Sequence, residues 1–158
     1  MKYFFFRNSC IFCAFIVLIF IVNTAVIVLA GELVKVLGIA CHDYFLWLII
    51  AGWVWAILLP FIFFQTAKNA KELNRPMVIK LWTFNFLEIL FIQIAAETLL
   101  SSPAILCYHS DGQNGMEMII GAGAGAVFVL LYSLGLDYLK NRRSNDSNLR
   151  EEQEMRSN

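Results

Sequence analysis

Four long apolar segments, separated by short polar ones, dominate the pattern of this chain. They cover roughly residues 9–30, 44–65, 77–99 and 116–139. Each is close to the ~20 residues that a helix needs to cross a hydrocarbon core ~30 Å thick. Because a helix satisfies its own backbone hydrogen bonds in lipid, the pattern predicts an all-α integral membrane protein. We expect residues 1–139 to form an antiparallel bundle of four transmembrane helices.

The first segment has some features of a secretory signal peptide. Lys2 and Arg7 precede it, and it ends in VLAG. Its apolar run is longer than the ~7–15 residues of a signal peptide's apolar region, so we predict an uncleaved spanning helix. The following connection, residues 31–43, is itself fairly apolar and either continues this helix or lies along the membrane surface.

Composition agrees with a membrane protein. Hydrophobic side chains make up 59% of the 158 residues, and the mean hydropathy is +0.68. Ordinary soluble domains contain about 45–50% apolar residues. Twelve Lys and Arg residues balance twelve Asp and Glu residues. Without a basic field over the molecule, we expect no nucleic-acid partner.

The positive charges predict the orientation. Nine Lys and Arg residues lie before the first segment, between the second and third, and just after the fourth: Lys2, Arg7, Lys68, Lys71, Arg75, Lys80, Lys140, Arg142 and Arg143. The other two connections contain only Lys35. Because basic connections stay in the cytoplasm, we expect both termini there, with the protein in a plasma or inner membrane. Residues 140–158, which are polar and mixed in charge, are predicted to be a disordered tail or a frayed helix.

The third segment carries four polar residues in an otherwise apolar span: Asn85, Glu88, Gln93 and Glu97. Glu88 falls near the middle, where an ionised acid costs about 2.5–3.5 kcal/mol on insertion scales. No Lys or Arg lies in the middle of another segment. We therefore expect a protonated carboxyl, hydrogen-bonded to Asn85 or to another helix, with Asn23 of the first segment as one candidate partner.

These polar residues point to two sides of one helix. Asn85 and Glu88 share a face, and Gln93 and Glu97 form an i, i+4 pair on nearly the opposite face. We expect protein contacts on both sides. Two interpretations of Glu88 stay open: a site that takes up and releases a proton or cation during transport, or a neutral link between helices, together with residues such as Asn23.

The stretch GAGAGA, Gly121 to Ala126, satisfies the pattern GxGxxA of a dinucleotide-binding turn. That motif requires a strand of a soluble sheet before it, and no such sheet is predicted here; a phosphate buried in the fourth segment would also lack a Lys or Arg neighbour. A spacing of four remains: Gly121 and Gly125 form GxxxG, and Ala122 and Ala126 widen the small surface beside them. Such a surface allows another helix to approach closely, within the bundle or in a second copy. We expect no nucleotide or other cofactor here.

Four cysteines complete the candidate chemistry. Cys41 and Cys107 fall in the two predicted outer connections, where a disulfide would be stable. Each is followed closely by a histidine, which raises the alternative of a metal site, although adjacent Cys-His pairs chelate poorly. Cys10 and Cys13 form a CxxC at the cytoplasmic end of the first segment. Our prediction is no metal.

No nucleophile, base and oxyanion set is present in the sequence, so we do not expect an enzyme. The first hypothesis is a small membrane protein that acts by helix association. It would associate either with a second copy of itself or, as an accessory, regulatory or protective partner, with a larger membrane protein. The alternative is a proton- or ion-coupled carrier or channel subunit that uses Glu88. Thiol or metal chemistry in the outer loops is the weaker alternative.

Overall fold

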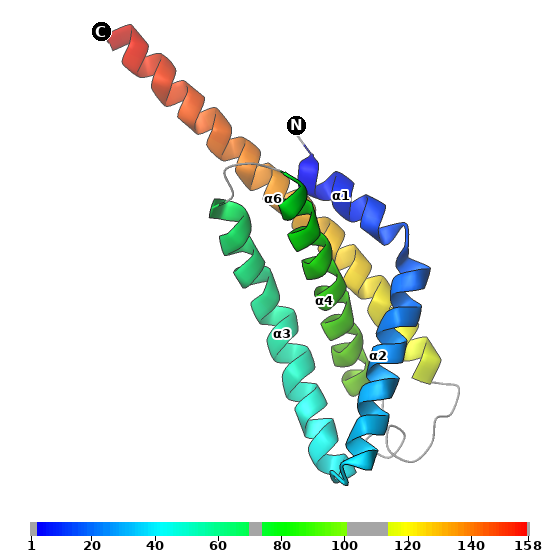
Figure 1. Cartoon of the computed structure of the whole chain (residues 1–158). Coiled ribbons are helices and arrows are strands. Elements are labelled where there is room, and N and C mark those ends of the chain that lie inside the picture. The colour runs from blue at the N-terminus through cyan, green and yellow to red at the C-terminus, as the bar shows by residue number, and fades with distance from the viewer. Residues whose placement is uncertain (1–2, 70–73, 101–113, 158) are drawn as a thin grey trace.

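The described residues, 3–69, 74–100 and 114–157, form five helices in a computed structural model of the chain. They are α1 (Phe4–Cys13), α2 (Ile16–Val36), α3 (Cys41–Asn69), α4 (Arg75–Leu100) and α6 (Asn114–Ser157), as Figure 1 shows. Four of them contain segments long and apolar enough to cross a membrane: Ile16–Leu33, Asp43–Lys68, Arg75–Leu100 and Glu117–Arg143. The prediction of an all-helical protein with four such segments is confirmed.

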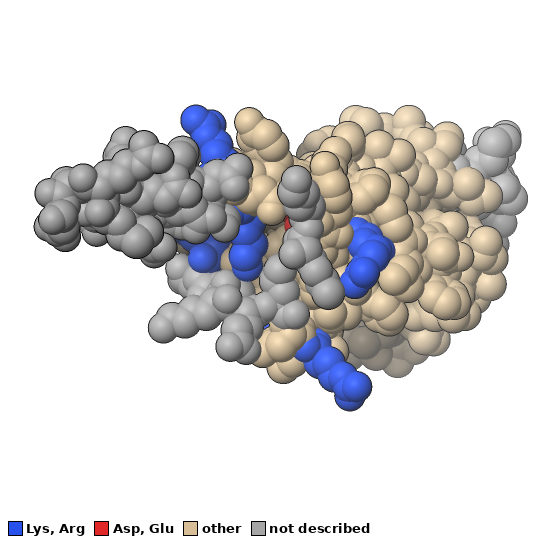
Figure 2. Space-filling view, turned by 90° about the horizontal axis from the view of Figure 1, so that it is seen from above, with Lys and Arg blue, Asp and Glu red and all other residues tan. Residues whose placement is uncertain are grey.

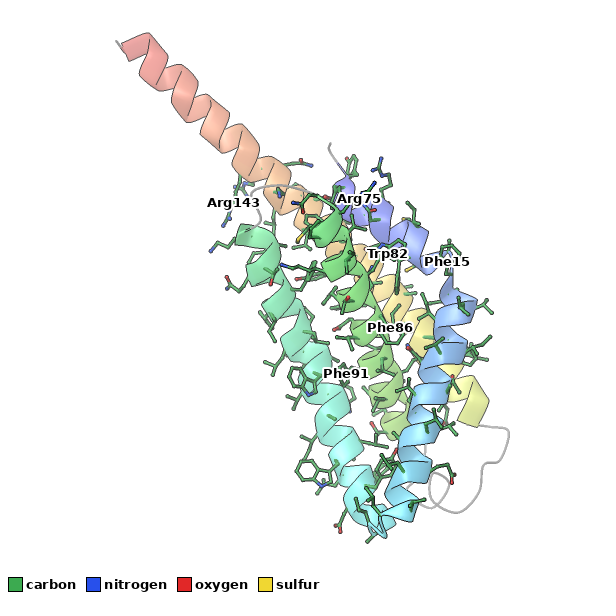
Figure 3. The ribbon with its side chains drawn as sticks, viewed as in Figure 1. Phe15, Arg75, Trp82, Phe86, Phe91 and Arg143 are labelled. Atoms are coloured by element: carbon green, nitrogen blue, oxygen red, sulfur yellow. The ribbon has the colours of Figure 1, made fainter. Side chains whose placement is uncertain are left out.

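The first predicted span differs from the observed helices. It was expected as one helix from residue 9 to residue 30, but the chain turns at Ala14 and Phe15, between α1 and α2. Here the Phe15 N–H donates to the Phe12 carbonyl, a three-residue step in place of the four-residue helical one. Figure 3 labels Phe15 at this junction. At ten residues, α1 is about 15 Å long and too short to cross a membrane alone.

The connection after α2 is shorter than expected. The helix continues to Val36, so part of the apolar stretch at residues 31–43 extends the first span. Gly38 then adopts a φ of +69°, the left-handed conformation that commonly follows a helix end. The α3 helix begins three residues later, where the Ala40 carbonyl accepts from the N–H groups of Asp43 and Tyr44.

The α4 helix lies at the centre of the molecule, in contact with α1, α2, α3 and α6. In an 18-residue apolar stretch of each helix, half of the α4 residues are buried, compared with 6% of those of α3 and 17% of those of α2. On α2 the buried positions recur every four residues, at Ile19, Asn23 and Ile27. The outer helices therefore use one narrow face each, and α4 is enclosed.

Aromatic rings fill the core between α3, α4 and α6. The rings of Phe63 and Phe84 stack with centroids 4.5 Å apart, and Tyr132 lies beside both. The Tyr132 hydroxyl donates to the carbonyl of Pro60, which lies inside α3. This bond holds α6 against α3 near Pro60, which has no backbone N–H and therefore interrupts the hydrogen-bond pattern of α3.

The α6 helix is the longest, at 44 residues. Its apolar part packs on α4, and its last part, residues 140–157, is the polar tail of the sequence. In Figure 1 this last part extends away from the other helices, at the same end of the molecule as α1. The start of α1 and the exit of α6 therefore lie together.

Candidate functional site

The candidate site is a set of buried polar side chains along α4. Asn85, Glu88 and Gln93 are fully buried, and Glu97 is 2% exposed. All four polar side chains are thus enclosed by neighbouring helices, and Asn85, Gln93 and Glu97 belong to one row of residues four apart rather than to opposite faces. The hydrogen bonds of Asn85 and Gln93, together with those of α1, form three links between segments far apart in the sequence.

The first link holds the start of α1. Tyr3 occupies the position before the helix, and its side chain makes no capping hydrogen bond. Asp137 of α6 supplies that cap: its Oδ1 accepts from the Phe5 N–H at 3.1 Å and its Oδ2 from the Phe6 N–H at 2.8 Å. Asp137 is only 3% exposed. A carboxylate at a helix N-terminus satisfies unpaired donors and the positive end of the helix dipole.

The second link joins α1, α4 and α6 one turn further along. The Ser9 and Ser133 hydroxyls lie 2.7 Å apart, and the Asn85 side-chain amide donates to the Ser9 oxygen at 2.9 Å. All three side chains are fully buried. In an apolar environment each bond avoids the cost of an unpaired polar group, so the trio fixes α1 in one register against α4 and α6.

The third link joins α2 to α4 and α6. The Asn23 amide donates to Gln93 Oε1 at 2.7 Å, and the Gln93 amide donates to the Met118 carbonyl at 3.2 Å. Asn23, one candidate partner of Glu88, donates to Gln93 instead, and neither Glu88 oxygen has a hydrogen-bond partner among the described residues. The reason is position, because Asn23 lies on the one face of α2 that reaches α4 at the level of Gln93.

Glu88 is the exception among these side chains. Neither carboxylate oxygen has a hydrogen-bond partner among the described residues. Asn85, the other expected partner, donates to Ser9, and its own Oδ1 also lacks a donor. A protonated Glu88 carries an O–H donor, and the unpaired Asn85 Oδ1 lies one helical turn away along α4. The site therefore contains one carboxyl group suited to hold a proton.

Glycines set the spacing between α6 and α4. A Cβ atom at Gly121 would lie 2.8 Å from the Gln93 Cα, and one at Gly125 would lie 3.0 Å from the Ile89 Cα. A Cβ atom at these distances would force the α4 backbone to shift, so the close approach of the two helices depends on glycine at both positions. Ala122 is 3% exposed and Ala126 is half-buried. The small surface predicted from the sequence thus lies against α4 of the same chain.

Comparisons with known proteins add nothing to this geometry. No family model, no curated protein and no solved structure matches the chain.

The predicted cysteine chemistry lies mainly outside the described part of the chain. The Cys41 side chain and all of Cys107 fall there, so their disulfide stays a prediction. Of the other two thiols, Cys10 is exposed and Cys13 is half-buried, and both are free. Burial, and secondarily the neighbouring Cys10, raises the pKa of Cys13 to about 11. Among the described residues, no group of three His, Cys, Asp or Glu side chains is placed to hold a metal ion.

Ser9, Ser133 and Asp137 were not predicted from the sequence as members of the site. A signal for two of them exists in α6. The spacing of four that joins Gly121 to Gly125 continues through three further positions, and all five residues are buried: Gly121, Gly125, Val129, Ser133 and Asp137. Residues four apart lie on one face of a helix. Extending the GxxxG pattern in this way would have placed Ser133 and Asp137 on the packed face.

Proposed function

We propose that the chain is a multi-pass protein of a plasma or inner membrane, with its four apolar helices in an antiparallel bundle and both termini in the cytoplasm. The contacts of Gly121 with Gln93 and of Gly125 with Ile89 support opposite directions for α4 and α6, because the numbers rise along one helix as they fall along the other. Figure 2 shows Lys and Arg side chains gathered at the end where α1 begins. Cytoplasmic loops carry such an excess.

We infer that the protein acts without catalysis, by association of its helices with a second copy or with a larger membrane protein. One observation carries this inference: half of the residues in the α3 span are exposed, while α4 is enclosed. The exposed residues of α3 include two tryptophans that stack on no other ring among the described residues, Trp47 and Trp53. Aromatic side chains are enriched where proteins bind one another. The three internal links make the bundle a stable body that can present this surface.

Photo-crosslinking tests the association. A benzophenone amino acid replaces Trp53 or Ile57 on the exposed surface of α3, and Leu131, an exposed residue of α6, serves as the matched control. In native membranes we expect discrete protein adducts from α3 and only lipid adducts from Leu131. Mass spectrometry of the adducts distinguishes a second copy from another protein. Lipid adducts alone at both α3 positions, with a single chain in mild detergent, would contradict the proposal.

A second candidate function rests on Glu88. Both of its oxygens lack partners among the described residues, at a depth where a buried acid is the usual mark of proton or ion passage. Under this proposal the carboxyl takes up and releases a proton during transport. Thiol or metal chemistry in the outer loops has no comparable support.

Substitution of Glu88 by Gln separates this function from a structural one. Glutamine keeps the shape and hydrogen-bonding capacity but cannot titrate. Glu97, the other buried acid of α4, provides the matched control as Glu97→Gln. If Glu88 carries protons, proteoliposomes with an internal pH dye should lose proton flux only with Glu88→Gln, while both variants stay assembled. Undiminished flux in Glu88→Gln would eliminate the transport proposal.

A further inference from the structure

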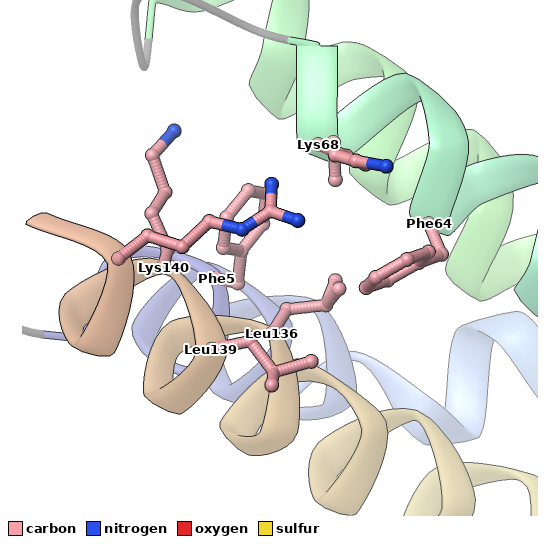
Figure 4. Close-up of a pocket in the computed structure, with 8 residues that line it drawn as sticks. Phe5, Phe64, Lys68, Leu136, Leu139 and Lys140 are labelled. Carbon is pink, nitrogen blue, oxygen red and sulfur yellow. The ribbon is translucent and has the colours of Figure 1, made fainter. Parts of the chain in front are cut away.

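A cavity lies at the basic end of the molecule, away from the buried polar links. It has a volume of about 430 Å³ and is bounded by α1, α3 and α6 (Figure 4). Phe5, Phe64, Ala67 and Leu136 form an apolar floor. In Figure 4, Phe5 and Leu136 lie between Lys68, near the end of α3, and Lys140 on α6. Ligand pockets commonly measure about 300–1,000 Å³, so the cavity has the size of a binding site.

Three cations border this apolar floor: Lys68 from α3, and Lys140 and Arg143 from α6. Lys68 and Arg143 are exposed, while the Lys140 ammonium lies 5.9 Å from the centroid of the Phe5 ring. Asp137, whose two oxygens accept from α1, interacts with Lys140. Counting these four described residues, three positive charges and one negative charge leave a charge of +2 beside the cavity. The cavity therefore suits an anion with an apolar part.

The cations and the floor follow the polarity of a lipid bilayer. The apolar span of α3 ends at Lys68 and that of α6 at Arg143, so the cations lie where both spans end. Phe64 and Leu136 lie one to two turns inside the spans. In a bilayer, this arrangement puts positive charge at the level of the phosphates and an apolar surface at the level of the acyl chains.

We propose that this cavity binds one anionic phospholipid of the cytoplasmic leaflet. Its phosphate contacts Lys68 and Arg143, and the first part of an acyl chain lies against Phe5 and Leu136. Arginine matches phosphate oxygens with two parallel donors, and lysine adds a point charge. The inference rests on the proposed membrane orientation, which brings this end of the bundle to the cytoplasmic headgroups. Bound lipid would hold α3 beside α6 in addition to the bond from Tyr132 to Pro60.

Native mass spectrometry of the full chain in mild detergent, titrated with phosphatidylglycerol, tests the site. The variant Lys68→Gln/Arg143→Gln removes two cations from the cavity. The control Arg75→Gln/Lys80→Gln removes two exposed cations from the same end that do not border it. We expect one tightly bound lipid per chain, and about thirtyfold weaker binding in the cavity variant, roughly fivefold for each cation. The control should change by less than about threefold.

A second variant, Ala67→Leu, keeps the three cations and fills part of the apolar floor. It should also weaken binding if the acyl chain occupies the cavity. Equal losses in the cavity and control double variants, equal binding of phosphatidylcholine, or unaffected binding in Ala67→Leu would each overturn the lipid site. Displacement of the lipid by inorganic phosphate alone would also overturn it, in favour of a simple anion site. If alkaline carbonate releases the chain from membranes, the proposal that it is an integral membrane protein fails. If the chain resists carbonate extraction but fails the lipid-binding tests, only the lipid site is overturned.

Discussion

Replacing Asp137 by Ala should release α1 from the bundle. The carboxylate accepts two backbone N–H groups of the first turn, at 3.1 and 2.8 Å, and Tyr3 provides no cap of its own. Alanine would leave both donors unpaired at the positive end of the α1 dipole. Lys140, which interacts with Asp137, would then face that positive end without a carboxylate between them.

The expected loss follows from these two bonds. A hydrogen bond to a charged group contributes about 1.5–3 kcal/mol, and removing an N-cap side chain costs about 0.5–2 kcal/mol. The two bonds share one side chain and are not additive, and water near the helix end would replace part of them. We therefore expect α1 docking to weaken by about 2–4 kcal/mol. Since each 1.4 kcal/mol is tenfold, α1 should open about 30 to 700 times more often.

Amide hydrogen exchange, followed by mass spectrometry in detergent, measures this opening directly. Peptides from α1 should exchange faster in Asp137→Ala by the stated factor, while peptides from the centre of α4 should keep their protection. Asp137→Asn, which keeps one acceptor oxygen but no charge, should give an intermediate increase. Unchanged exchange in α1 would refute the capping role, and an equal increase in α4 would mean that Asp137 supports the whole bundle rather than α1.

Three other predictions follow from packing, ionisation and hydrogen bonding. Gly125→Leu should lower the melting temperature in detergent, because the new side chain meets the α4 backbone; the loss of stability should be about 1–3 kcal/mol or more. Gly123→Leu, at a position with open space around it, should leave the melting temperature unchanged. Equal effects of the two variants would contradict this packing. Burial of Cys13 raises its pKa to about 11, so at neutral pH maleimide should label the exposed Cys10 first. The labelling rate of Cys13 should then rise about tenfold per pH unit up to that pKa. Single Cys→Ser variants separate the two labelling rates, and equal rates at pH 7 would argue against the burial of Cys13. Asn23→Leu should lower the free energy of unfolding by about 0.6–2 kcal/mol, because it removes the hydrogen bond that links α2 to α4. Denaturant titrations measure this change. A neutral or stabilising effect would show that the docking of α2 does not depend on this hydrogen bond.

The number and approximate limits of the long helices could be predicted because they depend on local composition. The segments expected at 44–65 and 77–99 lie within α3 (Cys41–Asn69) and α4 (Arg75–Leu100). The turn between α1 and α2 could not be predicted in this way. Ala14 and Phe15 are neither glycine nor proline, so the sequence there carries no local stop signal. The direction of α1 depends on Asp137 and Ser133, which lie more than 120 residues away.

The polar residues of α4 were found from the sequence, but their partners were not. Periodicity shows which face of a helix carries Asn85 or Gln93, and it does not show which helix lies opposite that face. Ser9 and Asn23 look alike in this respect, since both are single polar residues in an apolar segment. Only the packing assigns Ser9 to Asn85 and Asn23 to Gln93.

Two rows of residues spaced four apart explain why these links fall where they do. One row runs along α4 and the other along α6, and all ten members are buried: Leu81, Asn85, Ile89, Gln93 and Glu97, and Gly121, Gly125, Val129, Ser133 and Asp137. At the glycines of the α6 row, Gly121 and Gly125, the α6 backbone approaches the α4 backbone closely. At its polar residues, Ser133 and Asp137, the row forms hydrogen bonds with α1. Glu88 is buried beside these rows but belongs to neither, and neither of its oxygens has a hydrogen-bond partner among the described residues. An apolar side chain there would avoid the cost of two unpaired oxygens, so the interhelical hydrogen bonds that account for Ser9, Asn85 and Gln93 do not account for Glu88.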